Sequence, residues 1–493
     1  MANASGPAIE GIEPGAFTHQ ASGVQYRVFT ENGSAWLSYS RAGDPAMQGR
    51  QELDFFLGSG NHGRTYLYSI GGYWFETPIA WYARRHGYDM RPSYLNDKEM
   101  PFNLPVTAGC LRCHATGVQT EDPGTRNHYA GLPFLEGGIA CEACHGDTAQ
   151  HVSSAGKAAP INAGKLDAER RDSVCIVCHL EGDTTVPHRG RALVNYKVGE
   201  RIGDYASFFV LSGAGTTDRA VSQVEALNLS TCKRSSGDRM SCMSCHDPHG
   251  SPAPQDRVAS YRRRCTACHS DTKFTAAHFP NQPDCTQCHM PKSSPTDIPH
   301  EQWTDHRILR QPRTVVLESA APGESALIPV PGIVQHPADR DLALAYYDIV
   351  SHGNVSFATR ARKLLEAVTP DNEVMTAIGV LAQMANDRKQ ATDVYSDALA
   401  RNPDDYTAAM NLGVLLARSG ETARASELWR KAFARNQDIT GLGMNLAAAS
   451  CLLGDKTAAE DTLRIVLRYS PDHQSGRQEL NAMQSGAQPC PPK

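Results

Sequence analysis

Long apolar runs and an excess of one charge are both missing from this sequence. No stretch of about 18 uninterrupted apolar residues occurs, so no membrane span is expected. The 48 Lys and Arg residues nearly balance the 53 Asp and Glu residues, and the net charge of −5 indicates neither a nucleic-acid nor a lipid-surface partner. The first residues, MANASGPAIEGIEP, lack the basic and apolar segments of a signal peptide.

Cysteines outside one recurring motif are few. Of the 15 cysteines, Cys232, Cys451 and Cys490 alone fall outside it. An odd remainder of this kind does not indicate a disulfide framework, and we interpret Cys232 as a free thiol.

The recurring motif is Cys-x-x-Cys-His, and SCMSCHDPHG, residues 241 to 250, contains one copy. Two cysteines at this spacing can form half of a zinc site, a redox pair or the attachment site of a c-type haem. Neither of the first two uses requires His directly after the second cysteine, yet all six copies have it. The sequence therefore predicts six covalent haems. Their cysteines are Cys110, Cys113, Cys141, Cys144, Cys175, Cys178, Cys242, Cys245, Cys265, Cys268, Cys285 and Cys288.

The histidine of each motif is expected to bind the haem iron from the proximal side. These proximal ligands are His114, His145, His179, His246, His269 and His289. Because the chain has 19 histidines, 13 others are available for the distal positions. We expect the distal ligands among His62, His151, His188, His249, His278, His300 and His306. His249 follows its motif too closely to cross over its own haem, so it is expected to reach a neighbouring one.

The chain divides into regions that differ in amino-acid composition. Residues 1–105 contain about half of the aromatic residues and no motif, and Asn32-Gly33 between two β-prone runs predicts a hairpin in a small β-containing cap. Residues 106–310 hold all six motifs in sequence rich in Gly, Pro, Asp and Ser, so we expect short helices and irregular loops packed around haem. Residues 311–336 are predicted to be a linker.

From residue 337 to 493 the sequence is helical in character and repeats every 34 residues. The segments 371–404, 405–438 and 439–472 align without gaps, and Asn386, Gly420 and Gly454 occupy the same position in the three segments. The period is typical of tetratricopeptide repeats, which bury their apolar faces by stacking. The predicted fold class is mainly α with irregular loops: a haem-packed multihaem cytochrome c domain, a small β-containing N-terminal cap and a C-terminal tetratricopeptide α-solenoid.

The segments GGIACEACHGDTAQHV, ERRDSVCIVCHLEGD, SCMSCHDPHG, CTQCHMPK and HEQWTDHRI resemble multihaem cytochromes c with C-terminal tetratricopeptide repeats. The haem part of that family is related to the tetrahaem cytochrome that accepts electrons from hydroxylamine oxidoreductase. The resemblance implies closely packed haem pairs, with His249 serving a neighbouring haem. It also implies a periplasmic or extracellular location, so we expect a leader peptide to be missing from this chain.

Three functions remain open from the sequence. The first is electron transfer along six haems, with the repeats docking a redox partner protein or another copy of the chain. The second is an oxidoreductase that converts a small nitrogen or sulfur compound at one open haem, with the His62 loop shaping the pocket. The third is an assembly scaffold with a redox-sensing head. No residue is marked as a catalytic acid or base.

Overall fold

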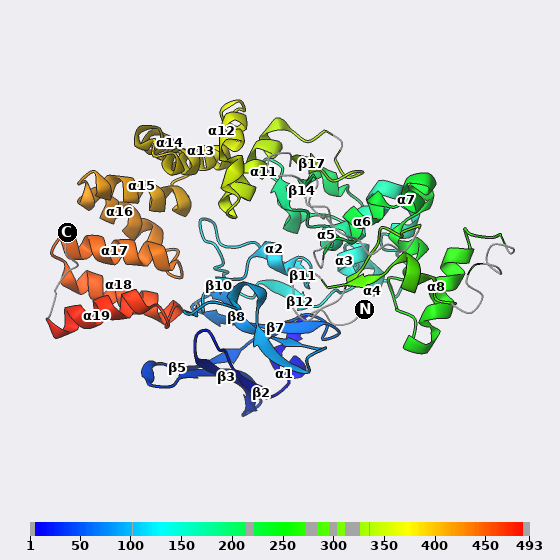
Figure 1. The fold of residues 1–493 in the computed structure, drawn as a ribbon, viewed down its shortest axis with the longest axis horizontal. Helices are drawn as coiled ribbons and strands as arrows, with labels where there is room; N and C mark the ends of the chain where they lie inside the picture. Colours follow the sequence, from blue (N-terminus) through cyan, green and yellow to red (C-terminus); the bar gives the residue numbers. More distant parts are fainter. Residues whose placement is uncertain are drawn as a thin grey trace. The chain divides into compact units, whose positions relative to one another are not determined.

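The computed structural model describes residues 5–100, 102–212, 221–271, 278, 283–294, 303–310, 326–334 and 336–486 (Figure 1). Contacts between residues divide the chain into two compact units. The motif unit contains residues 139–345, and the cap-repeat unit combines residues 4–138 with residues 346–493. Each unit is described by itself, and the domain boundaries expected from the sequence stay predictions.

The cap begins with two antiparallel sheets. The first has the order β2-β3-β4-β5 and consists of β2 (Gly15–Thr18), β3 (Val24–Glu31), β4 (Ser34–Arg41) and β5 (Asp44–Leu53). The predicted hairpin is confirmed, because Glu31 pairs with Ser34 across the turn. Asn32 and Gly33 have φ angles of 52° and 82°, the left-handed conformation that this two-residue turn requires.

The second sheet has the order β1-β6-β7-β8-β10, with β9 added to β8. Its strands are β1 (Ser5–Pro7), β6 (Phe55–Leu57), β7 (Gly63–Ile70), β8 (Tyr73–Tyr82), β9 (Gly87–Met90) and β10 (Leu104–Pro105), and helix α1 spans Ala8–Gly11. Buried residues of both sheets form one core, which includes Val24, Tyr26, Leu37, Tyr66 and Ile79. The β-containing cap is thus confirmed, and it is more extensive than a hairpin.

The three predicted repeats form consecutive helix pairs. Their helices are α13 (Asn372–Met384) and α14 (Arg388–Arg401), α15 (Tyr406–Arg418) and α16 (Thr422–Phe433), and α17 (Thr440–Leu452) and α18 (Lys456–Tyr469). Asn386, Gly420 and Gly454, in the turn within each pair, all have positive φ angles. The helices α11 (Asp339–Ser351) and α12 (Ala358–Glu366) precede these three pairs, and helix α19 (Gln474–Ser485) follows them. The helical-repeat character of this region is therefore confirmed.

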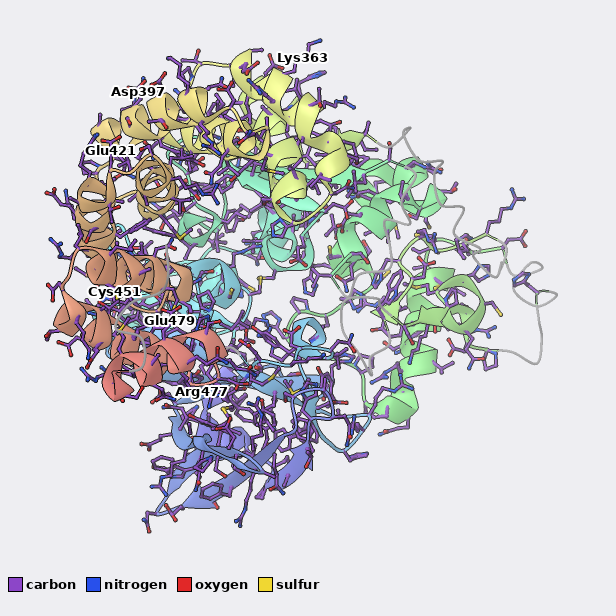
Figure 2. All side chains as sticks on the ribbon, turned by 60° about the vertical axis from the view of Figure 1, so that its left-hand side comes forward. Lys363, Asp397, Glu421, Cys451, Arg477 and Glu479 are labelled. Atoms are coloured by element: carbon purple, nitrogen blue, oxygen red, sulfur yellow. The ribbon has the colours of Figure 1, made fainter. Side chains whose placement is uncertain are left out.

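Ion pairs buried within the cap-repeat unit join its two parts. Asp472, whose side chain is fully buried, accepts hydrogen bonds from both Nη atoms of Arg41, at 2.7 and 2.5 Å. The backbone amide of Met100 donates to the same carboxylate at 2.8 Å. Asp438, also fully buried, pairs with Arg126 of the cap. Figure 2 labels Arg477, whose Nη1 contacts Asp44 at 3.0 Å and adds a further link.

The motif unit consists of short helices and strands. Helix α5 (Ala168–His179) packs on strand β14 (Ala206–Leu211) around a core that includes Ile176, Leu180 and Phe208. The other elements are α3 (Glu142–His145), α4 (Ala149–Ser153), β13 (Thr184–Pro187), α6 (Gln223–Leu229), α7 (Thr231–Ser236), α8 (Arg257–Thr266), α10 (Cys285–His289), β15 (Lys292–Ser293), β16 (Trp303–Thr304) and β17 (Leu327–Pro329). Throughout the described part of the chain, no helix combines the length and apolarity needed to cross a membrane.

Candidate haem sites

A single turn of helix shapes each motif in the motif unit. The amide of His145 donates to the carbonyl of Cys141 at 2.8 Å, and the same bond joins His246 to Cys242 and His269 to Cys265, both at 2.9 Å. Residues three and four positions apart share one side of such a turn. Both thiols and the imidazole of a motif therefore lie on the same side, which fits attachment and iron ligation of one haem.

Three motif histidines face a second imidazole. The ring centroids of His145 and His249 are 5.9 Å apart, with an angle of 5° between the ring planes. Two imidazoles bound to one metal ion, at about 2 Å per bond, have ring centroids roughly 6 Å apart. This first pair therefore fits a shared iron atom.

The other two pairs have the same spacing. The centroids of His246 and His306 are 6.2 Å apart, and those of His278 and His289 are 6.0 Å apart. The ring planes are inclined by 29° and 23°. Each pair thus joins one motif histidine to one histidine that the sequence predicts as a distal ligand.

Hydrogen bonds to backbone carbonyls orient several of these rings. Nδ1 of His145 lies 2.7 Å from the carbonyl oxygen of Ile161, and Nδ1 of His306 lies 2.7 Å from that of Thr304. Nδ1 of His289 lies 2.5 Å from the carbonyl oxygen of Leu309. With the proton held on Nδ1, Nε2 would be the nitrogen available to iron, as is usual for ligating histidines.

Burial adds to this preference in one candidate pair. It lowers the pKa of both His246 and His306, which favours the neutral imidazole that iron binding would require.

Contacts between motifs connect the candidate sites of the motif unit. The side chain of Cys175 in the third motif lies beside that of Cys242 in the fourth, and the side chain of Cys265 in the fifth lies beside that of Cys285 in the sixth. Tyr261 on α8 places its ring edge against the ring of His246, at 5.9 Å between centroids. The second to sixth motifs therefore form one contiguous set.

The first motif belongs to the cap-repeat unit. Helix α2 (Ala108–Leu111) carries Cys110, and Glu121 accepts a hydrogen bond from the amide of Ala108 at its start, at 2.5 Å. Leu111 packs in a buried cluster with Trp74 and Tyr129. Strands β11 (Ala115–Val118) and β12 (Phe134–Gly137) pair directly after His114.

Among the other predicted distal ligands, His151 has the same hydrogen-bond pattern as the paired ligands. Its Nδ1 lies 2.7 Å from the carbonyl oxygen of Ala158. His62 lies exposed just before β7 in the cap, and His300 lies outside the described residues. Ligation by these three residues stays a prediction.

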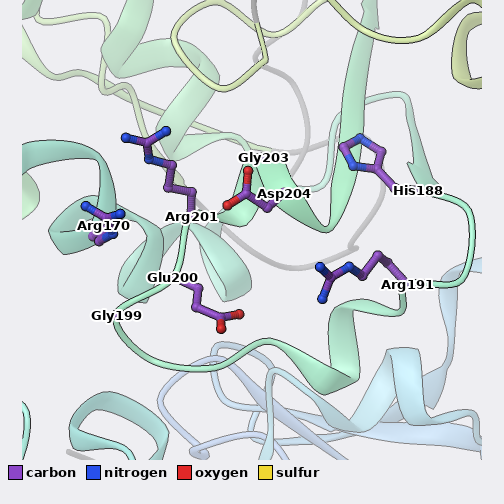
Figure 3. A pocket seen from close by; sticks show the side chains of 8 residues that line it. All are labelled: Arg170, His188, Arg191, Gly199, Glu200, Arg201, Gly203 and Asp204. Carbon is purple, nitrogen blue, oxygen red and sulfur yellow. The ribbon is translucent and has the colours of Figure 1, made fainter.

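His188 lies in a different setting. Its Nε2 is 3.0 Å from Oγ of Ser207 and 3.2 Å from Oδ2 of Asp341. His188 lines a hollow of about 510 Å³. Figure 3 shows its side chain with those of the other charged residues that line the hollow, Arg170, Arg191, Glu200, Arg201 and Asp204. The nitrogen that would bind iron contacts protein groups here, so ligation by His188 gains no support from this geometry and stays a prediction.

The remaining cysteines differ from one another. Cys232 is a free thiol on α7, as expected. Cys451, labelled in Figure 2, is disulfide-bonded, which the odd remainder of cysteines did not predict. Cys490 lies outside the described residues.

The structure also identifies residues that the sequence could not. The carbonyls of Ile161, Thr304 and Leu309 orient histidines that are candidate ligands, but every residue has a carbonyl group, so no sequence signal marks them. The partner of each distal histidine was likewise not predictable, because His145 and His249 are 104 residues apart.

Comparisons with known proteins agree with this chemistry. A family model described as "Doubled CXXCH motif" matches residues 236–274, and one described as "Cytochrome c554 and c-prime" matches residues 81–146. The multiheme cytochrome MtrA of Shewanella baltica (strain OS185) is 30% identical over 178 residues, which cover 33% of this chain and 53% of MtrA. The chain thus spans about half the length of that relative. The resemblance to multihaem c-type cytochromes is confirmed, and with it the use of the motif for covalent haem.

Solved structures similar to the chain are helical-repeat proteins. MamA from AMB-1 aligns with a TM-score of 0.26 at 23% identity, over 29% of this chain and 82% of its own. YrrB, a tetratricopeptide repeat protein, aligns with a TM-score of 0.25 at 18% identity, over 28% of this chain and 76% of its own. Scores this low carry no argument, and the description of the repeats rests on their own helices.

Proposed function

We propose that this multihaem c-type cytochrome binds six haems and transfers electrons along them outside the cytoplasm. The three imidazole pairs, with centroids 5.9 to 6.2 Å apart, are the observation that carries the proposal. An iron with imidazole on both faces is six-coordinate and low-spin, and exchanges electrons without binding a substrate. The proposed distal ligands of the second, fourth and sixth haems are His249, His306 and His278.

The order of the haems follows from the same contacts. His246 and His249 would bind the fourth and second irons, and their Cα atoms can be at most about 11 Å apart, since the two residues are three positions apart in the sequence. The neighbouring cysteines of the third and fourth motifs, and of the fifth and sixth, support an arrangement in which the third haem would lie beside the fourth and the fifth beside the sixth. Electrons would thus pass through closely spaced haems from the second to the sixth motif.

The repeats would dock a redox partner protein or another copy of the chain. Stacked helix pairs provide extended binding surfaces, which supports this role. The disulfide at Cys451 supports a location outside the cytoplasm, because disulfides persist in oxidising compartments.

Mass spectrometry and a potentiometric titration of the purified protein test the proposal together. We expect a mass increase of six haems and reduction by six electrons per chain. Nitrite, hydroxylamine and sulfur oxyanions should leave the haem absorption spectrum unchanged. Fewer than six haems would refute the haem count, and turnover of one of these compounds would replace electron transfer with catalysis at an open haem.

A further inference from the structure

The helix that leads into the fifth motif has an unusual charge. The segment RVASYRRRCTACH, residues 257 to 269, contains four arginines and no acidic residue, although the chain as a whole has a net charge of −5. Helix α8 (Arg257–Thr266) carries all four. We refer to Arg257, Arg262, Arg263 and Arg264 as the α8 arginine surface.

These arginines are available to a partner. Arg257, Arg263 and Arg264 are exposed, and Arg262 is half-buried. Within the described part of the chain, none of the four forms an ion pair. Cations in the last turn of a helix stabilise its negative end, and this accounts for Arg263 and Arg264 but not for Arg257, which lies in the first turn.

The arginines lie beside candidate haem sites. Cys265 of the fifth motif is in the last turn of α8, and Cys268 and His269 directly after the helix are exposed. Tyr261, in the middle of α8, contacts the ring of His246 of the fourth motif. An electron that arrives at this helix would therefore meet the fifth haem and pass to the fourth.

We propose that the α8 arginine surface docks an acidic redox protein, which exchanges electrons with the fifth haem. This rests on the proposed electron-transfer function. A local excess of positive charge attracts an acidic partner and accelerates its association by about 10- to 1,000-fold at low salt. A second copy of this chain or an anionic membrane are other anionic surfaces, and the experiment distinguishes them.

The test uses the full-length protein with all its haems and a reduced acidic ferredoxin as the probe. Haem reduction is followed by stopped-flow absorbance at several ionic strengths. The variant R257E/R263E reverses two exposed charges and leaves Arg264, which lies near Cys245 and His246, in place. The control R388E/R418E makes the same change in net charge at two exposed arginines of α14 and α15.

We expect R257E/R263E to slow reduction by ferredoxin at least about tenfold at low salt and to flatten its dependence on ionic strength. R388E/R418E should behave as the native protein. Photoreduced 5-deazaflavin, a neutral and strong reductant, should reduce all three proteins equally, which shows that haem incorporation and electron acceptance are intact.

Several outcomes would overturn the proposal. Equal slowing by both variants would show an effect of net charge alone. If the reduction potentials shift but the rate with ferredoxin and its salt dependence are unchanged, the arginines serve haem propionates. If phosphatidylserine vesicles slow the reduction of the native protein, but ferredoxin reduces R257E/R263E as fast as the native protein, the surface binds a membrane. If the rate of reduction depends on the concentration of the cytochrome and not on that of ferredoxin, the surface binds a second copy of the chain. Failure of the photoreduced deazaflavin to reduce the native protein would instead refute the proposed function.

Discussion

The two units of the molecule differ in what holds them together. The cap-repeat unit buries two large apolar clusters, one in the cap around Tyr26 and Tyr66 and one in the repeats around Tyr395 and Trp429. The described core of the motif unit is the smaller cluster around Phe208, and imidazole pairs lie at its candidate haem sites. We expect covalent haem to take the place of a large apolar core in the motif unit.

Removing one haem attachment should have the largest effect. In the variant C242A/C245A, the iron that would join His246 to His306 is lost, and we expect amide hydrogen exchange protection to disappear from α8 and from residues 303–310. The helices α13 to α18 should keep their protection, since their core contains no haem. Unchanged protection in both regions would contradict the comparison, and the variant C232A serves as the control that should lose no haem.

Breaking the buried ion pair should have the next largest effect, now on the cap-repeat unit. The variant Asp472→Ala leaves Arg41 and Arg477 without their buried carboxylate, which should lower the free energy of unfolding by about 3–5 kcal/mol. Urea unfolding followed by circular dichroism measures the loss. The control Asp461→Ala removes an exposed pair with Arg464 and should cost about 0–1 kcal/mol. Equal losses in the two variants would mean that the buried pair does not join cap and repeats.

A smaller loss should follow from crowding the repeat core. A Cβ atom at Gly413 would collide with the indole ring of Trp429, so Gly413→Ala should destabilise the unit by about 1–3 kcal/mol. At Gly441, exposed on α17, nothing lies within 4 Å of the added Cβ, and Gly441→Ala should stabilise by about 0.5–1 kcal/mol. Thermal unfolding of both variants would measure this, and destabilisation by both would contradict the packing described here.

The smallest effect concerns pH. Burial raises the pKa of Glu76, which pairs with Arg91 in the cap. The folded state therefore binds more protons than the unfolded state above the ordinary Glu pKa, and stability should fall as the pH rises through the raised pKa. The free energy of unfolding, measured by urea titrations between pH 4.5 and 7, should fall more steeply with pH in the native protein than in Glu76→Gln. Parallel curves would exclude this contribution.

The sequence predicted features that depend on local spacing. The hairpin at Asn32-Gly33 and the turns at Asn386, Gly420 and Gly454 were readable because a left-handed backbone selects Gly or Asn. The motifs were readable because one haem takes its cysteines and proximal histidine from five consecutive residues.

Features that depend on distant residues were not predictable. Arg41 and Asp472 are 431 residues apart, and nothing in either neighbourhood indicates their pairing. The sequence likewise predicted candidate distal histidines but not the motif histidine that each one faces, because the two lie far apart in the chain. His306 was predicted as a ligand, but its place opposite His246 is a property of the folded chain.

Low-temperature electron paramagnetic resonance of the oxidised protein, scaled to its haem content, tests the central claim most directly. We expect low-spin ferric signals that account for six haems, because imidazole on both faces keeps each iron six-coordinate. In the variant His306→Ala, one haem equivalent should become high-spin. A high-spin signal of about one haem in the native protein would show an open iron and contradict an electron-transfer chain in which every haem is capped.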